Sequence, residues 1–545
     1  MLGGLLFVLI GWLVLTVALP VYALLSKAFQ GPDGSFVGAK NFVAYFANPA
    51  LSASIANSLT IGIVSTIICI SLAFVSAYAL TRTKMPGRSL FRLVTQLPLL
   101  APSLLPAIGL VYLFGNKGLA KALMFGATIY GPIGIVIGEV FWTFPHALII
   151  LTTALALSDA RLYEAAAALR APPFRVFLTV TLPGVRYGLI SATLVVFTLV
   201  VTDFGVPKVI GGQYNVLATD IYKQVVGQQN FVMGAVVGVI LLIPAVFSFV
   251  VDRIVQRRQT ALLSARAVPY EPTPDTFVDR MFLGICSLIA FAILAVVGTA
   301  IFASFATYWP YNLLPSFKNY NFDLMDGGGW KSYWNSLTLA SLTAIFGAVI
   351  VFLGAYHVEK TRRGGPARTI AHLLALLPLA VPGLVLGLGY IFFFNARSNP
   401  LNFIYGTMAI LVICTISHFY SVAHLTAVTA LKQIDNEFET VAASLRVPIW
   451  RTFFRVTLPV ALPALFDIAL YLFVNAMTTV SAVVFIYAPS TTLAAIAVLN
   501  MDDAGDIAPA AAMATLILAT SIVVRLAYTL ITGRVLLRAQ AWRQR

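Results

Sequence analysis

Long apolar runs constrain this chain more than any other feature of its sequence. Each run covers about 18–25 residues, which is enough for a helix to cross a hydrocarbon core of about 30 Å. Because the chain is also 60% hydrophobic and only 10% charged, we predict an all-α membrane protein with about twelve transmembrane helices. The runs centre on residues 2–26, 55–80, 93–115, 128–156, 187–203, 231–251, 281–306, 336–358, 370–395, 403–430, 461–485 and 510–532.

The positions of lysine and arginine predict the orientation of these helices. If both termini are cytoplasmic, the loops on the inside hold 26 of the 35 Lys and Arg residues. Cytoplasmic loops retain such an excess of positive charge. We therefore expect both termini in the cytoplasm, and the net charge of +15 needs no nucleic-acid partner.

Nucleotide, metal and thiol chemistry have no signature in the sequence. The phosphate-binding pattern Gly-x-x-x-x-Gly-Lys-Ser/Thr does not occur. The three cysteines, Cys69, Cys286 and Cys414, all lie inside apolar runs, as small core residues do. We expect a chain that is not an enzyme, with no catalytic residue, metal site or cofactor of its own.

The chain is a tandem duplication. The segments Asn-Ser-Leu-Thr at 57–60 and Val-Thr-Leu-Pro at 180–183 recur 278 and 276 residues later, and two prolines and a glycine over 98–109 recur 280 residues later. Each half has six spans, an even number, so both halves enter the membrane in the same orientation, as parallel repeats do. We expect two parallel six-helix modules, 1–252 and 281–545, joined by a cytoplasmic linker over 253–280.

The loop after the fourth span of each half carries the most specific pattern. In the first half, the Ala-rich segment 163–170 precedes Pro172, and aromatic and aliphatic residues then lead to Pro183; the second half repeats this over 439–459. Because proline disfavours helical geometry in the residue before it, we expect a short helix and then a second, amphipathic helix at an angle. Such a knob suits a groove in a partner protein, and a helix pair resting on lipid headgroups is the alternative.

These loops resemble the Glu-Ala-Ala motif of the permease subunits of binding-protein-dependent ABC importers. In that motif Glu-Ala-Ala is followed by three residues, a glycine and, further on, Leu-Pro. The resemblance implies a type I ABC importer transmembrane domain, with each loop a coupling helix that docks into an ATP-binding subunit. Arg170 and Arg446 stand at the position of the family's glycine, and in the second copy Thr440 stands at that of its glutamate, one residue after Glu439. The positions that take coupling roles by this resemblance are Glu164, Ala165, Ala166, Leu169, Arg170, Pro183, Glu439, Ala442, Leu445, Arg446 and Pro459.

The same resemblance implies the rest of the system. ATP and Mg would bind to two separate ATP-binding subunits, and a periplasmic or extracellular substrate-binding protein would deliver substrate to this multi-pass protein of a bacterial inner membrane. The stretch 202–215 most resembles the permeases for 2-aminoethylphosphonate, so we expect phosphonate uptake. The alternative is a ferric-iron permease, because the fused form with two six-helix halves resembles both groups.

Ionisable and polar groups inside or beside the apolar runs are candidates for the substrate pathway, because charge is costly there. We select Glu139, Asp203, Asp467 and Asn475; hydrogen-bonded packing between helices is the other interpretation of such residues. An ion-coupled secondary transporter would also have twelve spans in two halves, and a membrane scaffold is a further alternative. The secondary transporter has no reason to carry two proline-broken knobs at equivalent places, and copurification of an ATP-binding subunit would distinguish the importer from both alternatives.

Overall fold

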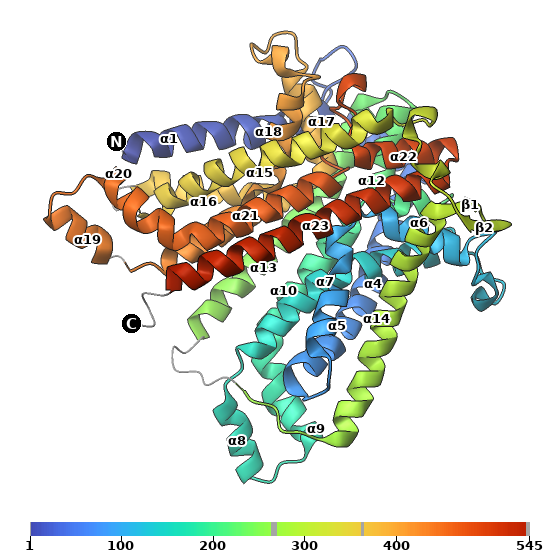
Figure 1. Cartoon of the computed structure of the whole chain (residues 1–545). Coiled ribbons are helices and arrows are strands. Elements are labelled where there is room, and N and C mark those ends of the chain that lie inside the picture. Colours follow the sequence, from blue (N-terminus) through green and yellow to red (C-terminus); the bar gives the residue numbers. More distant parts are fainter. Residues whose placement is uncertain (1, 263–269, 361–364, 436, 541–545) are drawn as a thin grey trace. The chain divides into compact units, whose positions relative to one another are not determined.

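The computed structural model describes residues 2–262, 270–360, 365–435 and 437–540 (Figure 1). Within these ranges ten helical segments are long and apolar enough to cross a membrane, which confirms the predicted all-α membrane fold. They are α1 (Leu2–Leu13) continued by η1 (Val14–Ala18) and α2 (Leu19–Ala28), α4 (Pro49–Arg82), α7 (Pro132–Ala156), α9 (Pro173–Val176) continued by η4 (Phe177–Thr181) and α10 (Leu182–Thr202), α13 (Phe231–Leu262), α14 (Thr276–Phe305), α15 (Gly329–Lys360), α18 (Met408–Lys432), α20 (Ile449–Thr452) continued by η10 (Phe453–Thr457) and α21 (Leu458–Thr478), and α23 (Ile507–Gln540).

Short elements connect these helices. A two-stranded antiparallel hairpin, β1 (Ala306–Tyr308) and β2 (Asn312–Pro315), follows α14. The other short elements are α3 (Lys40–Ala47), η3 (Lys121–Met124), α8 (Ala160–Ala168), α11 (Gly205–Ile210), α12 (Leu217–Tyr222), η5 (Lys223–Gly227), η6 (Lys318–Tyr320), η7 (Phe322–Leu324), η9 (Asn402–Ile404), α19 (Glu437–Ser444), η11 (Pro489–Thr491) and α22 (Ala494–Ala504).

The third apolar run of each half is broken rather than straight. In the first half α5 (Arg88–Thr95) and η2 (Leu97–Leu100) meet α6 (Leu104–Phe114) at 104°. In the second half α16 (Gly365–Leu376) and η8 (Leu377–Ala380) meet α17 (Gly383–Phe394) at 112°. Two prolines lie at each break, and proline both removes a backbone donor and bars helical geometry before it. Counting each bent pair as one span gives up to twelve in the part of the chain that the structure describes.

The fifth span of each half starts earlier than predicted. We expected the amphipathic segment after each loop proline to be a separate helix at an angle, with the spans at 187–203 and 461–485. Instead each segment runs directly into its span, from Pro173 to Thr202 and from Ile449 to Thr478. A π-helical turn, η4 or η10, precedes each Leu-Pro pair. The backbone hydrogen bonds are already shifted in this π-helical turn, so the missing N–H of the proline does not end the helix.

The described residues form two compact units that differ from the halves of the sequence. One unit comprises the described residues within Met1–Gly38, Asn321–Asp506 and Leu516–Arg545, and the other comprises those within Ala39–Tyr320 and Ile507–Thr515. The first helix of each half thus packs with the rest of the other half: α1 and α2 contact α15, α16 and α17, whereas α14 contacts α4, α5 and α6. The module boundaries 1–252 and 281–545 remain a prediction about the sequence repeat. Of the predicted linker, residues 263–269 lie outside the described residues, and α13 includes the part up to Leu262.

Repeated glycines permit this packing of the first helices. A Cβ atom on Gly109 of α6 would lie 2.5 Å from the carbonyl oxygen of Val296 in α14. A Cβ atom on Gly389 of α17 would lie 2.5 Å from the carbonyl oxygen of Pro20 in α2. Gly109 and Gly389 are equivalent in the repeat, and small residues let helix backbones approach closely in membranes. The repeated glycine therefore marks a close helix crossing in each unit.

The repeated Asn-Ser pair also has a structural role. Ser58 Oγ accepts a hydrogen bond from the amide of Leu217 at 2.8 Å, and Ser336 Oγ accepts one from the amide of Ala494 at 2.8 Å. These amides lie at the starts of α12 and α22, where helices have unpaired donors. Each serine thus fastens its long helix to the loop between the fifth and sixth spans of its half.

Candidate functional site

The loops after the fourth spans contain the short helices that the sequence predicts. In the first half, α8 starts after Asp159, whose side chain accepts a hydrogen bond from the amide of Arg161 at 3.1 Å. In the second, Asp435 accepts from the amide of Glu437 at 3.0 Å at the start of α19. Figure 1 shows α8 beyond the ends of α7 and α10, and α19 beyond the end of α21. Each short helix therefore projects from the end of its helical bundle.

The turn after each short helix explains the position at which the related motif has glycine. Arg170 has φ +50° and Arg446 has φ +55°, which is the left-handed region that favours glycine. The amide of Ala171 donates to the carbonyl of Ala166 at 3.0 Å, and the amide of Val447 donates to that of Ala442 at 2.8 Å. This is the Schellman arrangement that ends a helix. The arginines thus occupy a backbone conformation that suits glycine better.

Both loops expose large apolar side chains. Leu169 is 81% exposed and Leu445 is 70% exposed, although both lie at the tight turns described above. Phe174 in the first loop and Trp450 in the second are exposed as well. Glu164 is also exposed. An apolar surface of this kind needs a cover, which a partner protein or the membrane interface could supply.

A repeated aromatic cluster fixes the base of each loop. Phe177, in the π-helical turn η4, lies 6.0 Å from Phe74 and 6.3 Å from Tyr78 of α4, measured between ring centroids. In the other half, Phe453 of η10 lies 6.2 Å from Phe352 and 4.9 Å from Tyr356 of α15. Aromatic pairs at such distances pack favourably. These contacts attach each loop to the second span of its own half. The sequence shows that these aromatic residues are repeated, but it does not show that they are in contact.

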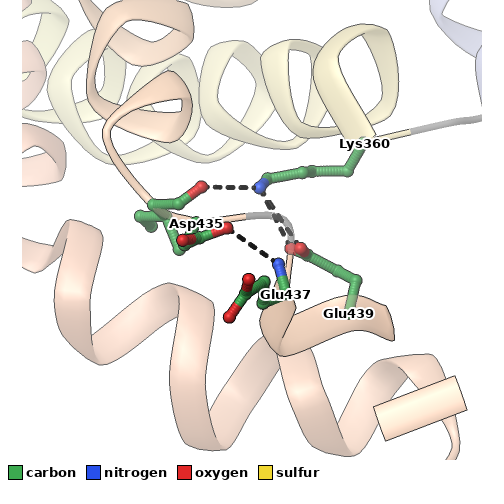
Figure 2. A network of polar contacts seen from close by, with 5 residues as sticks. Lys360, Asp435, Glu437 and Glu439 are labelled. Carbon is green, nitrogen blue, oxygen red and sulfur yellow. Dashed lines mark hydrogen bonds and ion pairs between the residues drawn. The ribbon is translucent and has the colours of Figure 1, made fainter. Parts of the chain in front are cut away.

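Glu439 does not point outward as a free acidic group. Figure 2 shows its carboxylate directed toward Lys360 of α15. The Lys360 Nζ atom lies 3.2 Å from Oε1 and 3.3 Å from Oε2 of Glu439, with hydrogen-bond geometry to Oε2. The side chains are 4% and 20% exposed. Of the two predicted loop glutamates, therefore, Glu164 is available to a partner and Glu439 is engaged within its unit.

The four candidates for the substrate pathway divide into two sets. Glu139 of α7 is fully buried, and neither of its carboxyl oxygens has a hydrogen-bond partner among the described residues. The Asp203 carboxyl is near enough to act on it electrostatically. Asp203 follows α10 and accepts a hydrogen bond from the amide of Val206 at 2.9 Å. The structure thus brings together two residues that are 64 positions apart in sequence.

Asp467 and Asn475 lie in the other unit and do not join this pair. Asp467 is on an exposed face of α21 and accepts a hydrogen bond from the hydroxyl of Tyr528. Asn475 donates to the carbonyl of Tyr471, one turn earlier in the same helix, at 2.8 Å. In the described part of the chain, no three His, Cys, Asp or Glu side chains converge in a way that could hold a metal ion.

A polar cavity of about 280 Å³ lies between the start of α4 and the segment 215–233. Asp220 is 2% exposed at its wall, and its Oδ2 atom has no hydrogen-bond partner among the described residues. Burial raises the pKa of Asp220, against the opposing effects of a hydrogen bond from Ser54 and the charge of Lys223. The cavity is lined by Asn48, Ala50, Leu51, Asn215, Asp220, Lys223, Gln224, Gln228, Asn230 and Met233.

Comparison with known proteins identifies the family. Residues 69–261 and 350–537 each match the model of the family described as "Binding-protein-dependent transport system inner membrane component", which together is more than half of the chain. The two matched ranges lie one in each half of the tandem repeat. The match therefore supports the duplication as well as the family.

The proteins similar to this chain include three transport permeases. The "Putative ferric transport system permease protein FbpB 1" of Haemophilus influenzae is 29% identical over 79% of this chain and 69% of its own length. The ferric transport system permease protein FbpB of Actinobacillus pleuropneumoniae is 27% identical over 94% of this chain and 76% of its own length. The "Putative 2-aminoethylphosphonate transport system permease protein PhnV" of Salmonella typhi is 27% identical over 37% of this chain and 76% of its own length. The two loop helices, the repeated long spans and the doubled family match agree: this chain belongs to the family of inner-membrane permease components of binding-protein-dependent transport systems, in a form with two fused halves.

Proposed function

We propose that this permease carries ferric iron. Similarity to the two ferric permeases carries the proposal, because it extends over 79% and 94% of this chain. The similarity to the aminoethylphosphonate permease covers 37% of the chain, about the length of one half. The phosphonate uptake that the stretch 202–215 led us to expect therefore has weaker support than its alternative, ferric iron.

ATP is hydrolysed by separate subunits in this proposal. Two ATP-binding subunits, which carry ATP and Mg, dock on the two loop helices α8 and α19. Exposed Leu169 and Leu445 at the helix ends support this assignment, since an apolar helix end fits a groove in a partner. Glu164 would lie at the same surface, as the Glu-Ala-Ala resemblance implies. The coupling roles that this resemblance gives to the loop residues are part of the proposal.

The membrane orientation follows from the need to place both docking loops on one side. Each half must then cross the membrane an even number of times, so each bent pair, such as α5 with α6, counts as one crossing. The excess of Lys and Arg in the loops that contain α8 and α19 supports a cytoplasmic position for them and for both termini. A substrate-binding protein would then dock on the outer loops, which include the segment around the polar cavity.

Transport would proceed by alternating access. Closure of the ATP-binding subunits moves the loop helices, and these move the spans so that the pathway opens outward; hydrolysis returns it to the inward-open state. Glu139 and Asp203 place two neighbouring carboxyl groups in the membrane region of one unit. A substrate pathway through the membrane needs polar groups of this kind.

Uptake of labelled ferric iron and labelled 2-aminoethylphosphonate, in cells with and without this gene, tests the proposed substrate. We expect loss of iron uptake alone in the deletion strain and recovery when the gene is restored. Loss of phosphonate uptake alone would refute the iron assignment and leave the family intact. A complementing gene that lacks residues 163–172, the part of the loop before the span that starts at Pro173, tests the coupling, and unchanged uptake in that strain would refute the role of the loop.

A further inference from the structure

A buried cation ends the second span of each half and contacts the loop helix. In the first half, Arg82 is the last residue of α4 and is buried. Its Nη2 atom donates to the carbonyl of Leu155 at 2.9 Å, in the last turn of α7. Its guanidinium carbon lies 4.8 Å from the ring centroid of Tyr163 in α8, and 4.4 Å from that of Tyr270. One guanidinium therefore joins the end of α4, the end of α7 and the loop helix.

The second half makes the same connection with different chemistry. Lys360 is the last residue of α15. Its Nζ atom donates to the carbonyl of Ile434 at 3.2 Å, just after α18, and pairs with Glu439 in α19 (Figure 2). Lys360 follows Arg82 by 278 residues and Glu439 follows Tyr163 by 276, which are the offsets of the sequence repeat. A cation over aromatic rings in one half thus corresponds to an ion pair in the other.

We propose that Arg82 and Lys360 are positioning residues that transmit movement of each loop helix to the membrane spans. This inference rests on the proposed docking of ATP-binding subunits to the loops. Each cation stands where the second span, the fourth span and the loop helix meet, so the loop helix cannot shift without pulling on both spans. The chain of contacts continues through the hydroxyl of Tyr163, which lies 3.1 Å from that of Thr181 in the fifth span.

Among the described residues, the linker between the halves takes part only in the connection made by Arg82, in the first half. Tyr270 and Tyr163 lie 4.6 Å apart between ring centroids, on the guanidinium of Arg82. Cation–π contacts of this kind gain strength when water is excluded. The linker residue therefore adds a third anchor to α8, whereas α19 depends on the ion pair with Lys360.

Charge exchange in the second half is the sharpest test. The variants are Lys360→Glu, Glu439→Lys and the two together, in the complete complex of permease, ATP-binding subunits and substrate-binding protein in proteoliposomes. Each single reversal leaves two like charges in contact, and we expect the iron imported per ATP hydrolysed to fall about tenfold. The double variant restores the pair in reverse and should recover to within about threefold of wild type. Lys432→Glu is the matched control, because it makes the same charge change as Lys360→Glu at an exposed position at the end of α18, outside the docking helix α19.

A second measurement makes the test independent of the transported substrate. Hydrogen–deuterium exchange of the α19 amides, in the solubilised permease alone, should accelerate about tenfold in each single variant and return in the double. In the first half, Tyr163→Phe retains the ring over Arg82 but loses the hydroxyl contact with Thr181, so it should keep more of the coupling than Tyr163→Leu, which loses both. Normal coupling in both single reversals, or a double variant no better than the worse single one despite normal assembly, would overturn the proposal. A wild-type complex that hydrolyses ATP but imports no iron would instead refute the proposed substrate.

Discussion

Replacement of Arg170 by glycine should stabilise the end of α8. Arg170 has φ +50°, and a non-glycine residue in that region costs about 1–2 kcal/mol. Glycine loses about 0.5–1 kcal/mol more than other residues in conformational freedom on folding. The difference leaves a gain of up to about 1.5 kcal/mol for Arg170→Gly, or up to about tenfold in the local opening equilibrium. Arg170→Val should lose at least about 1 kcal/mol, since branched side chains fit this region poorly.

Hydrogen exchange at a single amide gives the required assay. The amide of Ala171 donates to the carbonyl of Ala166 at 3.0 Å and should exchange more slowly in Arg170→Gly and faster in Arg170→Val. Arg161→Gly is the matched control on the same helix, where glycine should cost about 0.5–1 kcal/mol. Faster exchange in Arg170→Gly than in wild type would refute the argument from backbone conformation. It would show that the arginine side chain itself holds the turn.

Three further outcomes are expected for the purified permease. Asp220→Asn should raise the melting temperature at pH 7–8, because burial raises the pKa of Asp220 and the folded state loses stability as this carboxyl ionises. The gain should vanish below about pH 4, where the carboxyl is protonated in both the folded and the unfolded state. A gain that persists below that pH would contradict the assignment. Ser336→Ala removes the acceptor of the buried Ala494 amide and should cost about 1–3 kcal/mol in urea unfolding, so a loss of under a few tenths would contradict it. Gly188→Ala would place a Cβ atom 2.3 Å from that of Ala154 and should cost about 1–3 kcal/mol, with recovery when Ala154→Gly is added; no recovery would mean that the clash lies elsewhere.

The sequence predicted the class of fold because hydrocarbon thickness fixes the length of apolar helices. It also predicted the short loop helices, since alanine-rich segments followed by proline have few other conformations. It missed the bends near Pro102 and Pro382 because an apolar run of sufficient length is equally consistent with a straight span. The packing of the first helix of each half against the other half was missed for a related reason. Apolar periodicity shows that a helix is buried but does not identify the helix that covers it.

The candidate site was predictable in part. The loop motif located Glu164 and the turns, but it gave Glu439 the same coupling role as Glu164. The contact with Lys360 depends on a side chain 79 residues away. A signal for it did exist in the repeat, because Arg82 and Lys360 occupy equivalent positions at the ends of apolar runs. Similarly, Glu139 and Asp203 were selected separately as costly groups, and their proximity follows from the packing of α7 against α10.

The docking role of the loop helices can be measured directly in membranes. A photo-crosslinking residue is placed at Leu169 in one variant and at Leu445 in another, with an exposed apolar position elsewhere, Leu288 of α14, as the control. If the loops couple the spans to ATP hydrolysis, both loop variants form crosslinks to the ATP-binding subunit and the control does not. Crosslinks to lipid alone from both loops would contradict the account and would assign α8 and α19 to the membrane interface.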